Sequence, residues 1–173
     1  MTITAGITFY SLVLFVHIAA AVLAFGVTFV YGMVVPWTAK QYPQHLGYFH
    51  RVQNLLSTKW IPWTGGVLLL AGLYMAIDGP YDFGEWWVGL GLLIILVLLG
   101  MAGAFFAPRE RKLAELAERE FAAAPAGGGG AAPQPSEEYQ RLTKQSIVGG
   151  IFANALTLLA IFAMVMGSRG YLS

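Results

Sequence analysis

The stretch ITFYSLVLFVHIAAAVLAFGVTFVYGMVV, residues 7–35, decides the fold because it contains no Asp, Glu, Lys or Arg. About 20 apolar helical residues cross the roughly 30 Å of hydrocarbon in a bilayer, so this stretch can span it with some tilt. Three further apolar stretches, at about 57–77, 86–107 and 147–167, can also span it. Backbone polar groups cannot stay unpaired in lipid, so each stretch is expected to be helical. The sequence predicts an all-α, integral membrane four-helix transmembrane bundle.

The composition also indicates that the chain lies in a lipid bilayer. The 173 residues are 57% hydrophobic and 11% charged, with a mean hydropathy of +0.65. A soluble domain is typically about 25% charged, so an ordinary soluble enzyme is excluded. The formal net charge of +1 gives no reason to expect a nucleic-acid partner. The chain has no cysteine, which excludes disulfides and thiolate metal sites.

The basic residues predict the orientation of the bundle. Nine of the ten Lys and Arg residues lie in, or at the edges of, the two loops that follow the first and third spans. The positive-inside rule then places both loops in the cytoplasm and both termini outside, with the chain in a bacterial cytoplasmic (inner) membrane. The first span has no basic segment before it, so we expect it to be retained and not cleaved as a signal peptide.

The segments outside the spans have distinct characters. Residues 38–58 predict either an interfacial helix that lies on the inner leaflet and leads into the second span, or an irregular loop. Residues 109–121 predict a charged helix, expected to be a solvated stalk, with partner docking as the alternative. Residues 122–135 are rich in Gly and Pro and predict a flexible linker. Ser136 is a good N-cap for the last helix. We expect residues 1–173 to form a single transmembrane domain.

His17 lies well inside the first span. An ionisable group at that depth is costly and suggests a function. Small and polar residues share its helical face, so we expect it to point into the bundle. Two interpretations remain open: a neutral histidine hydrogen-bonded to a neighbouring helix, or a ligand for a cofactor. Asn154 in the fourth span is expected to make an interhelical hydrogen bond.

A haem held by His17 would need a second axial ligand, and the other two histidines are predicted near the cytoplasmic side. Methionines near the outer ends of the second and fourth spans are the alternatives, because a thioether can pair with imidazole on haem or bind Cu(I). Packing is the ordinary role of such methionines. The candidate haem ligands are His17, Met75 and Met164, and Met166 joins them as a candidate copper ligand. The spans carry no Asp or Glu, and no catalytic residues can be assigned.

The pattern Leu14-x-x-His17-x-x-Ala20-Ala21-Val22-Leu23-x-Phe25-Gly26 resembles the opening helix of a group of bacterial four-span membrane proteins. The likeness to an uncharacterised family of predicted integral membrane proteins covers most of the chain. It includes the segments Val34-Val35-Pro36, Pro108-Arg109-Glu110-Arg111 and Ser136-Glu137-Glu138-Tyr139-x-x-Leu142.

The chain is also distantly similar to the copper-resistance protein D family and to the bacterial membrane protoporphyrinogen oxidase family. In those families the first-span histidine is linked to haem or copper, which implies that role for His17. The oxidase family also uses a lysine in a later span, whereas in this chain Lys59 lies at the inner edge of the second span and Lys144 precedes the fourth.

Three functions follow as expectations. The first is the binding of haem b, or a related ligand, through His17 in a redox or envelope-related process. The second is a non-catalytic accessory or interaction subunit, or a homo-oligomer, with residues 109–121 as the cytoplasmic contact. The third is copper handling through His17 and the three methionines.

Overall fold

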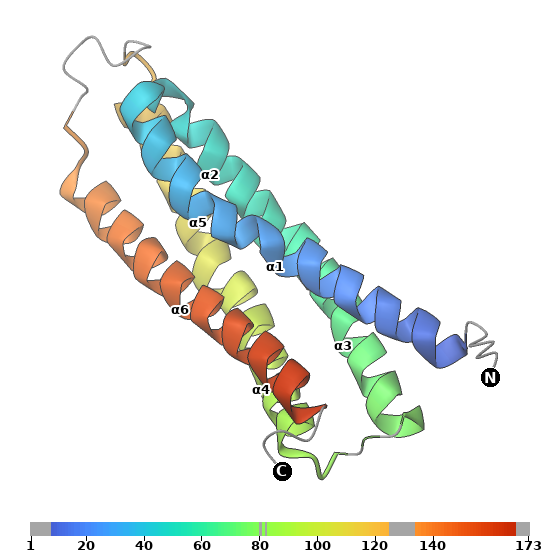
Figure 1. Ribbon diagram of the computed structural model, residues 1–173. Helices are drawn as coiled ribbons and strands as arrows, with labels where there is room; N and C mark the ends of the chain where they lie inside the picture. The colour runs from blue at the N-terminus through green and yellow to red at the C-terminus, as the bar shows by residue number, and fades with distance from the viewer. Residues whose placement is uncertain (1–7, 80, 82, 125–133, 169–173) are drawn as a thin grey trace.

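The computed structural model describes residues 8–79, 81, 83–124 and 134–168. Within these ranges the chain forms four long helical rods that run up and down beside one another (Figure 1). The first rod is α1, and the last is α6. The two middle rods each combine α-helices with short 3₁₀ or π segments. The elements are α1 (Phe9–Gln41), η1 (Pro43–His45), α2 (Leu46–Leu55), η2 (Leu56–Trp60), α3 (Ile61–Asp78), α4 (Trp86–Gly100), η3 (Met101–Phe106), α5 (Ala107–Glu120) and α6 (Glu137–Gly167).

All four rods are long and apolar enough to cross a membrane. Only 17% of the most apolar window of α1 is buried inside the protein, and Phe15 and Val22 are 67% and 65% exposed. Apolar surface on this scale would be a liability in water and fits contact with lipid. The all-α four-helix transmembrane bundle is therefore confirmed. Both described ends, at Phe9 and Gly167, lie at the same end of the bundle (Figure 1); that this end is the outer one stays a prediction.

The rods pack in pairs. Helix α1 packs mainly against α3, α4 against α6, and α2 against α5. The core between the membrane-spanning parts contains small residues of α1, such as Ala20 and Ala24, against Leu68 and Leu98. Small residues let backbones approach closely in lipid, where the hydrophobic effect provides no attraction between helices.

Of the two predictions for the segments beyond the spans, the helix over 38–58 is confirmed and the solvated stalk is wrong. Residues 38–58 are helical over most of their length, and α2 leads through η2 into α3 as the helical interpretation predicted; that α2 lies on a leaflet stays a prediction. Helix α5 is not a solvated stalk, because its apolar face packs against α2 and α6. That face and its neighbours form a second core, made of Leu46, Leu113, Leu116, Ala117, Phe121, Ala124 and Tyr139.

The helix boundaries also extend beyond the predicted spans. Helix α1 continues through Pro36 to Gln41. Helix α6 begins as predicted, with the Ser136 hydroxyl accepting a hydrogen bond from the Tyr139 backbone N–H at 3.2 Å. Residues 125–133, most of the predicted linker 122–135, lie outside the described residues.

Candidate functional site

His17 lies in the seam between α1 and α3. Its Nδ1 is 3.1 Å from the backbone carbonyl oxygen of Leu68. A carbonyl can only accept, so Nδ1 carries the proton and Nε2 keeps its lone pair. Nε2 has no hydrogen-bond partner among the described residues. It is also not one of the fully buried side-chain polar atoms that lack a partner in those residues. This is how a metal-binding histidine is commonly oriented, with one ring nitrogen donating to a carbonyl and the other free.

Gly72 makes room for the His17 ring. A Cβ added at Gly72 would lie 3.1 Å from Cε1 of His17, and one at Gly79 would meet the Tyr10 ring. The two contacts are seven residues apart on each helix, which shows that α1 and α3 run antiparallel in register along this seam. The imidazole therefore packs against α3 at Gly72 and donates to the Leu68 carbonyl one turn away.

The three candidate methionines lie at similar depth but in different places. The Thr28 hydroxyl donates to Asn154 Oδ1 at 2.7 Å, which confirms the expected interhelical bond and sets the register of α1 and α6. Because the two helices are antiparallel, moving eleven residues from this pair toward the start of α1 and the end of α6 leads to His17 and Val165. Met164 and Met166 are therefore at about the depth of His17.

Although their depths are similar, the methionines lie in different parts of the bundle. The Met164 methyl packs against Gly91 in the α4–α6 seam, and Figure 1 shows α1 and α6 diverging toward this end. Met166 follows two residues later and so lies on nearly the opposite side of α6. Met75 is on α3, three residues after Gly72, and is the candidate in the same seam as His17. The described residues include no group of three or more His, Cys, Asp or Glu placed to hold a metal.

His50 is too far from His17 to share a cofactor with it. It precedes Leu68 by eighteen residues on one continuous rod, which is about 27 Å at the rise of an α-helix. Instead, His50 belongs to a second polar site that sequence reasoning missed. This site, the His50–Glu110 cluster, joins α2, α5 and α6 and consists of His50, Glu110, Tyr139 and Ser146.

The His50–Glu110 cluster is buried and closely bonded. His50 and Glu110 are each 3% exposed, and Nδ1 of His50 lies 2.7 Å from Oε2 of Glu110. The Ser146 hydroxyl donates to the other carboxylate oxygen at 2.9 Å. The Tyr139 hydroxyl lies 3.1 Å from Nε2 of His50. With Nδ1 donating to the carboxylate, Nε2 accepts from Tyr139, so both ring nitrogens are used.

Burial supports the donor role of Tyr139. It lies eight residues before the fourth span, and loss of water around the phenol raises its pKa to about 12, with Glu110 nearby adding to the shift. The phenol therefore stays protonated at physiological pH. A fully bonded, enclosed cluster stabilises the packing of three helices and leaves no ring nitrogen for a ligand. The sequence signal for it was Glu110, the charged residue on an otherwise apolar helical face.

The family described as "Predicted integral membrane protein (DUF2269)" matches residues 11–168 of the chain. The match covers all four spans and confirms the resemblance to an uncharacterised integral membrane family. Searches of curated proteins and of solved structures found no match.

Proposed function

We propose, for a chain that belongs to the integral membrane protein family DUF2269, that His17 supplies an axial ligand to haem b within the bilayer. The observation that carries the proposal is the hydrogen bond from Nδ1 of His17 to the Leu68 carbonyl. It selects the tautomer whose Nε2 can bind iron. The distant likeness to families whose first-span histidine is linked to haem or copper supports the same role.

The donor set fits one axial position. Nε2 of His17 is free and oriented, and Leu68 is the outer partner that raises the basicity of a metal-bound imidazole. Met75 is the favoured thioether for a second position, because it belongs to the same α1–α3 seam, while Met164 packs against α4. Haem so held would supply one-electron redox chemistry. The chain would orient the imidazole and keep water from the iron.

The experiment is an absorption spectrum of the protein purified in mild detergent from haem-replete cells, oxidised and then reduced with dithionite. We expect a Soret band and reduced α and β bands in the wild type, and their loss in His17→Ala. Added imidazole should restore part of the Soret band in His17→Ala if the missing ligand is the cause. His45→Ala is the matched control, since His45 is exposed and outside the spans.

A colourless wild type, or bands that survive in His17→Ala, would contradict the proposal. Metal analysis of the same samples then separates the alternatives. Copper lost in His17→Ala would favour copper handling. A metal-free protein that co-purifies with a membrane partner would favour the accessory-subunit role.

A further inference from the structure

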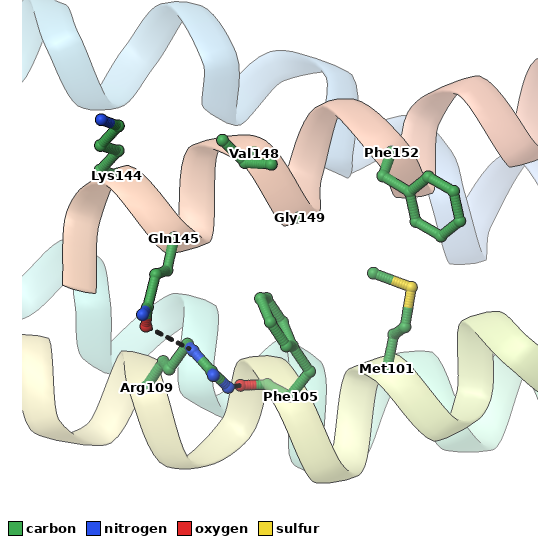
Figure 2. A pocket seen from close by; sticks show the side chains of 8 residues that line it. All are labelled: Met101, Phe105, Arg109, Lys144, Gln145, Val148, Gly149 and Phe152. Carbon is green, nitrogen blue, oxygen red and sulfur yellow. Dashed lines mark hydrogen bonds between the residues drawn. The ribbon is translucent and has the colours of Figure 1, made fainter. Parts of the chain in front are cut away.

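A groove at the boundary of the third and fourth spans has one basic end and one apolar end. It lies between η3–α5 on one side and α6 on the other and has a volume of about 480 Å³. Figure 2 shows Arg109 and Gln145 pointing toward one another at one end and Met101 and Phe152 at the other, while Lys144 lies at the rim of the first end with its side chain directed away from Arg109. No acidic residue lines it.

The two ends of the groove lie at different depths, one in the hydrocarbon and one at the head-group level. Phe152 lies inside the predicted fourth span, 147–167, and Lys144 lies three residues before it. Met101 lies inside the third span, 86–107, and Arg109 two residues beyond. At about 1.5 Å per residue, each side of the groove covers about 12 Å from hydrocarbon to the head-group level.

The guanidinium of Arg109 is fixed but not neutralised. One terminal N–H donates to the Phe105 carbonyl at 2.7 Å, Nε donates to Gln145 Oε1 at 3.3 Å, and Cζ lies 3.8 Å above the Phe105 ring centroid. These neutral contacts leave three of its five N–H donors for another group. Lys144 is exposed, and in the described part of the chain neither cation makes an ion pair.

The apolar end is shaped by a close helix contact. A Cβ at Gly149 would collide with one edge of the Phe105 ring, so glycine there lets that edge approach α6 closely. Val148 and Phe152 are 60% and 53% exposed beside it. The result is a strip of apolar surface, open to lipid, that leads to the unpaired Arg109, with the exposed Lys144 at the rim of the same end.

We infer that this groove binds an anionic phospholipid, with the phosphate at Arg109, Lys144 at the rim of the same end, and one acyl chain along Phe105, Val148 and Phe152. Charge complementarity selects an anionic head group, and basic pockets between transmembrane helices commonly hold one. The continuous apolar strip at hydrocarbon depth selects a lipid over a soluble anion. The inference is independent of haem binding, because the groove contains none of the candidate haem ligands.

The test is native mass spectrometry of the delipidated full chain in neutral detergent, titrated with dioleoyl phosphatidylglycerol or dioleoyl phosphatidylcholine. We expect one saturable phosphatidylglycerol site and at least tenfold weaker phosphatidylcholine binding. A cation near a membrane surface contributes on the order of fivefold, so Arg109→Gln with Lys144→Gln should weaken phosphatidylglycerol binding about thirtyfold. Gln145→Glu places a carboxylate beside Arg109 in a side chain of the same shape and should weaken phosphatidylglycerol binding about fivefold. This single variant still tests the site if the double variant does not fold.

The matched control is Lys40→Gln with Arg141→Gln, which removes the same charge from exposed positions outside the groove. An equal loss in this control would overturn the inference, because the attraction would then be diffuse. Equal binding of the two lipids, or unchanged phosphatidylglycerol binding in both groove variants, would also overturn it. So would full competition by inorganic phosphate, which would show an anion site without a lipid chain.

Discussion

The two halves of the bundle use a histidine in opposite ways. In the membrane-spanning half, His17 is half-buried and uses one ring nitrogen on the Leu68 carbonyl. In the flanking half, His50 is enclosed and uses both, on Glu110 and Tyr139. The comparison separates a histidine with one ring nitrogen free, which we propose binds a ligand, from one that joins helices. The number of ring nitrogens left free, more than burial alone, distinguishes the two roles.

The largest effect on stability should come from Glu110→Ala. The change leaves His50 and Ser146 without their shared acceptor in a site that excludes water. Breaking a buried pair in this way costs about 3–5 kcal/mol of unfolding free energy. Denaturation in mild detergent with increasing sodium dodecyl sulfate measures it. Glu118→Ala, at an exposed ion pair, is the control, and equal losses in the two variants would show that the cluster is not structural.

A smaller loss is expected for Tyr139→Phe. The ring and its packing against Phe121 remain, but Nε2 of His50 loses its donor. A buried acceptor left unpaired costs about 1–3 kcal/mol. The same denaturation assay applies, with Tyr48→Phe as the control because Tyr48 is 68% exposed. If Tyr139→Phe is as stable as the wild type, His50 has another partner and the contrast with His17 weakens.

Within the membrane, the bond between Thr28 and Asn154 should contribute less. Interhelical hydrogen bonds in lipid average about 0.6 kcal/mol by double-mutant cycles, because the unfolded chain in the membrane also finds partners. A cycle with Thr28→Val and Asn154→Ala should give a coupling energy of that size. A coupling above about 2 kcal/mol would indicate that the membrane half also depends on a polar network.

The weakest effect should be the pH dependence of the exposed pair between Arg51 and Glu118, outside the spans. The hydrogen bond and charge of Arg51 hold the pKa of Glu118 below its ordinary 4.5. A depressed carboxyl pKa stabilises the folded state above the unfolded value, and this contribution disappears as the pH falls through the lower folded value. Salt should reduce the difference between wild type and Glu118→Gln at pH 7. A difference that is insensitive to both pH and salt would rule out an electrostatic origin.

The sequence was sufficient for the membrane half. Four apolar stretches, the Ser136 cap and the position of His17 on a small, polar face all follow from helical spacing and the length of a bilayer. The flanking half was predicted less well, because the apolar residues of α5 show that a face is covered without showing by what. The His50–Glu110 cluster depends on residues 60 and 29 positions apart, and no local pattern reveals such a contact. The same limit explains why the methionines matched His17 in depth but not in position.

The most direct test of the contrast between the histidines is nitrogen-15 NMR of the full chain labelled at histidine, before and after one equivalent of ferric haem b. We expect a protonated Nδ1 and a free Nε2 for His17, with signals assigned by their absence in His17→Ala. Haem should then broaden the His17 signals beyond detection and leave those of His50 sharp. A His17 signal unchanged by haem, or one with Nε2 protonated, would contradict the account.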